Sequence, residues 1–183
     1  MKTAIALLFL CLPCFAQSTR VRCEHMEGDK IVAFWGTATC FGGKWVTCAH
    51  NVKGAESILL ESRGSWIRCD VKKKDSKVDI ALLNPDLNID VPDERKHGTF
   101  CHGSSEGKQV KSLDAKVVSS EPLGDHVEVK GMAHGLSGSA ITVDGETVGI
   151  ITGFAGVATK GETKRFKDCA FFISAERIKE FLK

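Results

Sequence analysis

The sequence predicts an all-β protein whose strands fall into two sets, followed by one short C-terminal helix. Short segments rich in β-branched and aromatic residues recur about every 8–12 residues with turn residues between them, which is typical of a sandwich or barrel. Asp144-Gly145 joins two such segments and is a strong two-residue hairpin signal. Ser174 is a candidate helix N-cap, because apolar residues spaced along one face follow it.

Each set holds several strands. The first set is expected at residues 31–35, 44–47, 57–60, 65–69 and 79–83, with a hairpin turn at residues 41–44. Residues 115–118, 125–130, 140–143, 147–152 and 170–173 are expected to form the second set. Residues 85–99, which contain Pro85, Pro92 and many charges, are the expected linker between an N-terminal unit of about 20–84 and a C-terminal unit of about 100–173. The helix is expected at about residues 175–183.

Length and composition limit the classes of protein that the chain can form. Its 183 residues allow one domain, or two small units that share a core. Hydrophobic residues make up 43% and charged residues 26%, so the chain is neither disordered nor fibrous. The formal net charge of +2 is too small to favour nucleic acid or a polybasic membrane anchor as a partner.

The N-terminal segment resembles a secretory signal peptide. Lys2 provides the positive charge, residues 4–12 are uninterrupted apolar residues, and small residues precede a cleavage point after Ala16. A membrane span needs about 20 apolar residues, more than this segment offers. We therefore expect residues 1–16 to be removed and residues 17–183 to be secreted or periplasmic, with no stable membrane association.

Six cysteines would remain after removal of the signal peptide, and an exported protein meets an oxidising environment. Two interpretations of their chemical state stay open. The cysteines either form up to three disulfides, with Cys40 and Cys48 facing each other across the expected hairpin, or stay as buried thiols. Cys23-x-His25 and Cys101-His102 suggest a zinc site, but no C-x-x-C or H-x-x-x-H spacing supports it, so no metal site is predicted. The six residues are Cys23, Cys40, Cys48, Cys69, Cys101 and Cys169.

Three short segments carry the residues of a nucleophilic site. His50 directly follows an apolar strand, Asp79 opens another, and Ser137 lies between glycines in Gly135-Leu136-Ser137-Gly138. A serine nucleophile needs a base for its proton and a carboxylate to orient that base. Glycines beside the serine let the chain turn so that backbone N–H groups face an oxyanion. Each segment alone is a common turn or strand end, but together they predict acyl-transfer chemistry.

The segments T-C-A-H, D-I-A-L-L and G-L-S-G-S-A, in the order His, Asp, Ser, resemble the three motifs of the chymotrypsin-like (trypsin-fold) serine proteases. Residues 36–38, 149–153 and 171–173 extend the resemblance over most of the chain, and it is strongest to compact bacterial members of the high-temperature-requirement type. The resemblance implies two six-stranded antiparallel β-barrels with the site in the cleft between them. It also implies a secreted serine endopeptidase that acts on proteins or peptides and needs no cofactor.

The resemblance assigns roles to individual residues. Ser137 is the expected nucleophile, His50 the base and Asp79 its orienting acid. The N–H groups of Gly135 and Ser137 form the expected oxyanion hole. Among the expected substrate-binding residues, Gly131 and Met132 form the base of the specificity pocket, and Ile151 and Phe154 form its far walls. The segment Thr152-Gly153-Phe154 is expected to pair with the substrate backbone as an added strand.

Departures from the family pattern refine the expected activity. Leu136 stands where digestive members carry an aspartate that receives a new N-terminus, so activation by that route is not expected. None of the expected pocket residues is acidic, and Phe154 fills space on the far wall. These features favour cleavage after a small or medium apolar residue. The main alternative is a non-catalytic homologue that acts as a secreted binding module; a β protein unrelated to proteases is a weaker one.

Overall fold

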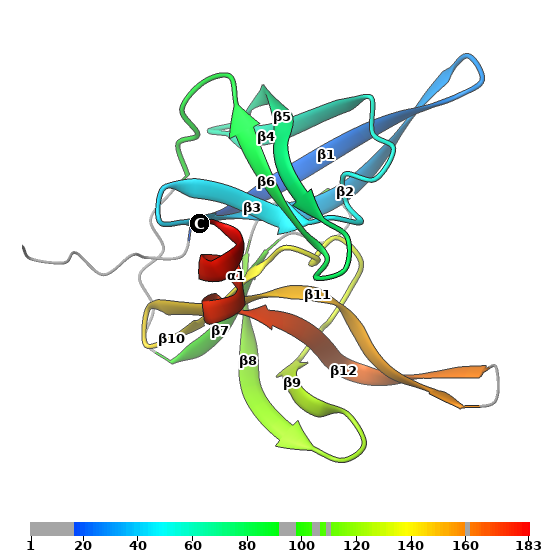
Figure 1. Ribbon diagram of the computed structural model, residues 1–183, viewed down its shortest axis with the longest axis vertical. Helices are drawn as coiled ribbons and strands as arrows, with labels where there is room; N and C mark the ends of the chain where they lie inside the picture. The colour runs from blue at the N-terminus through cyan, green and yellow to red at the C-terminus, as the bar shows by residue number, and fades with distance from the viewer. Residues whose placement is uncertain (1–16, 92–97, 104–106, 109–110, 160–161) are drawn as a thin grey trace, which may run out of the picture.

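The computed structural model describes residues 17–91, 98–103, 107–108, 111–159 and 162–183, and the expected signal peptide lies outside them. Two closed antiparallel barrels of six strands each lie one above the other (Figure 1). The all-β prediction with two six-stranded barrels is confirmed. Within the described residues, no helix is both long and apolar enough to cross a membrane.

The first barrel has the strand order β1-β2-β3-β6-β5-β4. In this barrel, β1 and β2 form a long hairpin that extends beyond the barrel wall (Figure 1). The core is filled by alternating inward-facing residues such as Val21, Leu60 and Leu83. The strands are β1 (Gln17–Glu27), β2 (Lys30–Phe41), β3 (Lys44–Cys48), β4 (Ser57–Ser62), β5 (Ser65–Asp75) and β6 (Ile80–Pro85).

The second barrel repeats the same topology. Its order of β7-β8-β9-β12-β11-β10 matches that of the first barrel strand for strand. The predicted Asp144-Gly145 hairpin joins β10 to β11, where Val143 pairs with Glu146. The strands are β7 (Thr99–Gly103), β8 (Lys111–Ser120), β9 (Gly124–Val129), β10 (Ala140–Val143), β11 (Glu146–Thr159) and β12 (Glu162–Ser174).

The helix α1 (Ala175–Phe181) lies against both barrels (Figure 1). The side chain of Ser174 accepts a hydrogen bond from the Arg177 backbone N–H, so the predicted N-cap is confirmed. Ile178 is fully buried against Val46 of the first barrel and Ile150 of the second. Burying a side chain of this size contributes about 1.5–3 kcal/mol, so α1 helps to hold the two barrels in one arrangement.

The cysteines do not form the disulfides that one interpretation proposed. All six described cysteines are free thiols, and four of them are buried. Cys40 pairs with Trp45 across the β2–β3 hairpin, because the turn is centred on Gly42 and Gly43. Cys48 therefore lies farther along the ladder, and the expectation that it faces Cys40 was wrong.

Candidate active site

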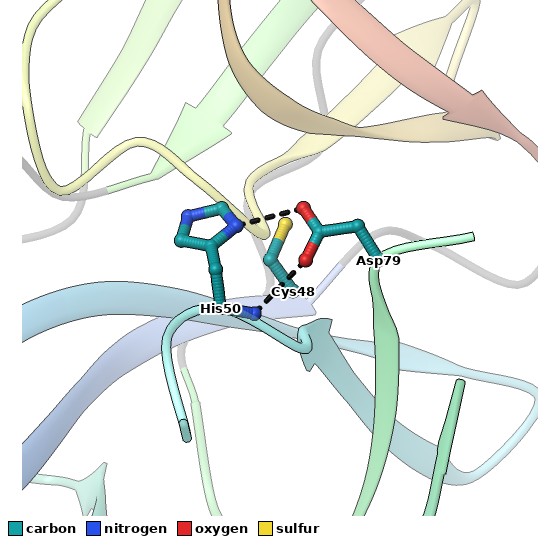
Figure 2. Close-up of side chains that lie close together, drawn as sticks. All are labelled: Cys48, His50 and Asp79. Atoms are coloured by element: carbon teal, nitrogen blue, oxygen red, sulfur yellow. Dashed lines mark hydrogen bonds and ion pairs between the residues drawn. The ribbon is translucent and has the colours of Figure 1, made fainter. Parts of the chain in front are cut away.

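The expected general base and its acid meet where β3 ends and β6 begins. Asp79 precedes β6 with φ +63°, a left-handed conformation that aspartate tolerates better than most residues. Its backbone carbonyl accepts a hydrogen bond from the Ala49 N–H at 3.0 Å. This contact brings the Asp79 carboxylate directly beside His50 (Figure 2).

The Asp79 carboxylate holds both the backbone and the ring of His50. Oδ1 accepts from the His50 N–H at 2.9 Å, and Oδ2 lies 2.7 Å from Nδ1 (Figure 2). A proton on Nδ1 satisfies the second contact and leaves Nε2 as a free acceptor. The His50 side chain is 47% exposed, so Nε2 can exchange a proton with a bound molecule.

Ser137 lies in a loop that both barrels hold. From the first barrel, the Thr37 N–H and the Asn51 Nδ2 each donate to the Ser137 carbonyl at 2.9 Å. From the second barrel, the Ile151 carbonyl accepts from the Gly138 N–H at 2.7 Å. A side chain at Gly138 would place its Cβ 1.9 Å from the Thr37 carbonyl oxygen, so only glycine fits there.

The N–H groups of Gly135 and Ser137 are available for an oxyanion. Among the described residues, neither donates a hydrogen bond to the protein. Gly135 has φ +87°, which glycine adopts without strain. Its carbonyl accepts from Thr37 Oγ1 at 2.8 Å, and this bond fixes the orientation of the loop.

The Ser137 hydroxyl is hydrogen-bonded to a backbone carbonyl of the second barrel. Oγ donates to the Thr152 carbonyl at 2.9 Å, and no hydrogen bond joins it to His50 in the described part of the chain. Both residues nevertheless line one cavity of about 780 Å³. Side-chain contacts of catalytic groups are often loose before substrate binds. The structure thus brings the three predicted residues to one site but leaves the hydroxyl in a resting position.

The cavity continues from His50 and Ser137 along the β1–β2 hairpin. Phe34, which is 52% exposed, and His25 form an edge-to-face ring pair there, 5.0 Å between centroids. None of the residues that line this cavity belongs to the expected substrate-pairing strand 152–154. Phe34 therefore presents an exposed apolar ring on the hairpin side of the cavity.

The expected pocket residues differ in accessibility. Ile151 is fully buried in the core of the second barrel, and Met132 is half-buried against the same core. Gly131 is exposed, and its N–H donates to Asp168 Oδ1 at 3.0 Å. The carboxylate of Asp168 therefore lies beside the expected base of the pocket, where the sequence predicted no acidic residue. Sequence spacing did not reveal this contact, because Asp168 lies 37 residues beyond Gly131.

A ring contact lies between the two segments expected to flank the pocket. His134 and Phe154 meet edge to face with their centroids 5.2 Å apart, and the Arg165 guanidinium lies 5.8 Å from the Phe154 ring. Thr152 Oγ1 donates to the Phe171 carbonyl at 3.2 Å. The half-buried Phe154 and the exposed His134 therefore narrow the approach between residues 131–135 and 152–154.

Cys48 is a further side chain at the site that the motif analysis did not select. Its thiol is fully buried and donates to the Ile151 carbonyl at 3.1 Å. Burial raises the pKa of the Cys48 thiol well above its usual value, and the negative charge of Asp79 raises it further. The Cys48 side chain lies between those of His50 and Asp79 in the view of Figure 2.

Two six-stranded barrels of identical topology, with a candidate site at their junction, define the chymotrypsin-like fold. The crystal structure of the active form of Rv3671c protease from M. tuberculosis is similar, with 16% identity and a TM-score of 0.65 over 91% of this chain and 79% of that chain. The inactive form of Rv3671c protease is similar to nearly the same degree, with 15% identity and a TM-score of 0.64 over 91% and 87%.

At these identities the likeness shows the fold, and the chemistry must be argued from the residues of this chain. No protein-family model matches the sequence, and the search of curated proteins found no match.

Proposed function

We propose that this chain is an exported serine endopeptidase in which Ser137 is the nucleophile, His50 the general base and Asp79 the residue that orients it. The observation that carries the proposal is the double hydrogen bond from His50 to Asp79, which leaves Nε2 free in the cavity that Ser137 also lines. The fold supports a protease function, because the similar Rv3671c structures are of a protease.

The proposed reaction follows from these positions. Ser137 Oγ adds to the substrate carbonyl carbon while Nε2 of His50 takes the hydroxyl proton. The oxyanion then accepts hydrogen bonds from the Gly135 and Ser137 N–H groups. The C–N bond breaks as Nε2 returns the proton to the leaving amine. Water, deprotonated by His50, hydrolyses the acyl-Ser137 ester and restores the hydroxyl.

Substrate binding would release the hydroxyl from its resting position. Residues 152–154 are expected to pair with the substrate backbone as an added strand. A substrate N–H that donates to the Thr152 carbonyl takes the acceptor that Ser137 Oγ now uses. Rotation about the Ser137 Cα–Cβ bond then becomes favourable, and the hydroxyl can turn toward His50.

The residue before the cleaved bond is proposed to be small or medium-sized and apolar. The His134–Phe154 contact supports this preference, because a large side chain would have to displace an aromatic ring. The apolar surface around Phe34 supports binding of residues that follow the cleaved bond. Proteins or peptides in extended conformation are therefore the proposed substrates.

A secreted binding module is the second candidate, and the Ser137–Thr152 hydrogen bond favours it, because the hydroxyl donates to a backbone carbonyl instead of to the base. Labelling with a fluorophosphonate probe separates the two candidates. We expect the purified protein to be labelled, and the Ser137→Ala and His50→Ala variants to be unlabelled. A folded protein that is not labelled would instead support the binding module and would contradict the proposed enzyme.

A further inference from the structure

The His50–Asp79 pair belongs to a cluster of three different metal-binding side chains. Cys48 Sγ, one ring nitrogen of His50 and one carboxylate oxygen of Asp79 all lie within 4.8 Å of one another (Figure 2). In the part of the chain that the structure describes, no other set of three or more such side chains gathers in this way. We propose that Cys48, His50 and Asp79 form an inhibitory zinc site.

The donor atoms suit zinc better than other common divalent ions. Thiolate, imidazole and carboxylate are its usual ligands, with bond lengths of about 2.0–2.3 Å and tetrahedral geometry. Magnesium and calcium prefer oxygen ligands alone. Three protein ligands also leave a fourth position for water. The anionic forms of Cys48 and Asp79 together balance the double charge of the ion, which lowers the cost of placing it in a partly buried site.

The three donor atoms, which lie within 4.8 Å of one another, must change their separations by about 1 Å or less to close on an ion. Two zinc ligands at tetrahedral angles stand about 3.3 Å apart. Nδ1 of His50 and Oδ2 of Asp79 are now 2.7 Å apart, so they must separate slightly. The bond from the His50 N–H to Oδ1 can persist and keep Asp79 in place. The ion would reach the buried sulfur from the solvent side, where the Asp79 side chain is 30% exposed.

Binding would remove the base without blocking the substrate cleft. The Cys48 thiol releases its proton to solvent, and the imidazole proton of His50 moves from Nδ1 to Nε2 by exchange with solvent, so that Nδ1 can bind the ion. A neutral imidazole bound through Nδ1 carries its proton on Nε2. One proton is therefore released per ion, and Nε2 can no longer accept the proton of Ser137. This inhibition rests on the proposed function, but ion binding does not.

The two cysteine–histidine pairs that the sequence suggested as zinc ligands do not belong to this cluster. Cys23 and His25 face the same side of β1, while Cys101 and His102 are neighbours on β7 and point to opposite faces. Cys48-x-His50 has the same spacing as Cys23-x-His25, but only the fold brings a carboxylate to it, from 29 residues farther along the chain.

Cobalt binding to the Ser137→Ala protein tests the site without relying on catalysis. We expect one Co²⁺ per chain and a thiolate-to-cobalt charge-transfer band, which Zn²⁺ should abolish by displacement. Cys48→Ser keeps the size of the side chain and a donor for the Ile151 carbonyl; it should lose the band and bind Zn²⁺ about 100-fold more weakly. Cys169→Ala, a cysteine outside the cluster, should retain both properties.

Inhibition of fluorophosphonate labelling provides a second test of the proposed site. Zn²⁺ should inhibit probe labelling of the unmodified protein at the concentration that displaces Co²⁺, and a chelator should reverse the inhibition. A cobalt spectrum without a thiolate band, or a band that survives Cys48→Ser, would overturn the zinc site. Normal labelling with no metal binding would refute this site alone, whereas metal binding in a protein that no probe labels would refute the proposed function alone.

Discussion

Asp79 accepts two hydrogen bonds from His50, one from Nδ1 at 2.7 Å and one from the backbone N–H at 2.9 Å. The first sets the tautomer of the imidazole and the second fixes where the carboxylate stands. Because Asp79 also holds the Ala49 N–H through its backbone carbonyl, the position of the ring is determined by the junction of β3 and β6.

Replacing Asp79 by asparagine should reduce kcat about 10⁴-fold, because an amide NH₂ facing Nδ1 favours the proton on Nε2. Asparagine tolerates the left-handed conformation at φ +63°, so the thermal midpoint should change little. Hydrolysis of a peptide substrate at saturating concentration measures the effect. A loss of less than tenfold in a folded variant would show that Asp79 does not orient the base.

Thr37 is expected to hold the oxyanion loop in its working conformation. Thr37→Val removes the hydrogen bond from Oγ1 to the Gly135 carbonyl at 2.8 Å while keeping the shape of the side chain. We expect kcat to fall about 10- to 100-fold with little change in KM, because the Gly135 N–H would no longer be fixed for the transition state. Steady-state kinetics separates the two constants.

Thr19→Val is the matched control for this variant. Thr19 is also buried, and its Oγ1 donates to the Glu61 carbonyl at 2.7 Å inside the first barrel. Each variant should lose about 1–2 kcal/mol of unfolding free energy, because each leaves a carbonyl without a partner. Equal losses of kcat in both variants would mean that Thr37 acts through stability alone.

Phe154 should restrict the size of the residue before the cleaved bond. Phe154→Ala removes the ring that meets His134 at 5.2 Å and opens the approach between the two flanking segments. We expect kcat/KM for a substrate with phenylalanine at that position to rise about 10- to 100-fold. The same constant for an alanine substrate should change less than threefold. An unchanged ratio between the two substrates would place the specificity pocket elsewhere.

Local signals predicted much of the fold. Asp144-Gly145 and Ser174 act in the structure as their residue types indicate, since turn and cap geometry depend on a few adjacent residues. The strands β1 and β7 were not predicted, although in β1 the charged Arg20 and Arg22 alternate with the buried Val21 and Cys23, the pattern of a half-buried strand. The Cys40–Cys48 interpretation was wrong because any symmetric turn centred on Gly42 and Gly43 pairs Cys40 with Trp45, and Cys48 lies three residues farther along β3.

The geometry of the candidate site was harder to predict from the sequence than the fold. Motif order selected His50, Asp79 and Ser137 as candidates, but a side-chain rotamer such as that of Ser137 depends on which acceptor lies closest in three dimensions. Thr37 contacts Gly135 from 98 residues away, and no spacing rule links the two. The sequence likewise gave no reason to place the Cys48 thiol within 4.8 Å of the Asp79 carboxylate, or Asp168 beside Gly131.

The buried thiols should make the fold sensitive to alkaline pH. Burial raises the pKa of Cys101 to about 12. Above the ordinary thiol pKa of about 9, the unfolded chain loses a proton that the folded chain keeps, so stability falls by about 1.4 kcal/mol per pH unit for each such thiol. Urea unfolding between pH 8 and 10.5 measures this slope.

The Cys101→Ala variant should make the slope of unfolding free energy against pH shallower by about 1.4 kcal/mol per pH unit. The control variant Cys169→Ala, at a half-buried position, should change the slope less. An unchanged slope in Cys101→Ala would show that Cys101 ionises equally in both states.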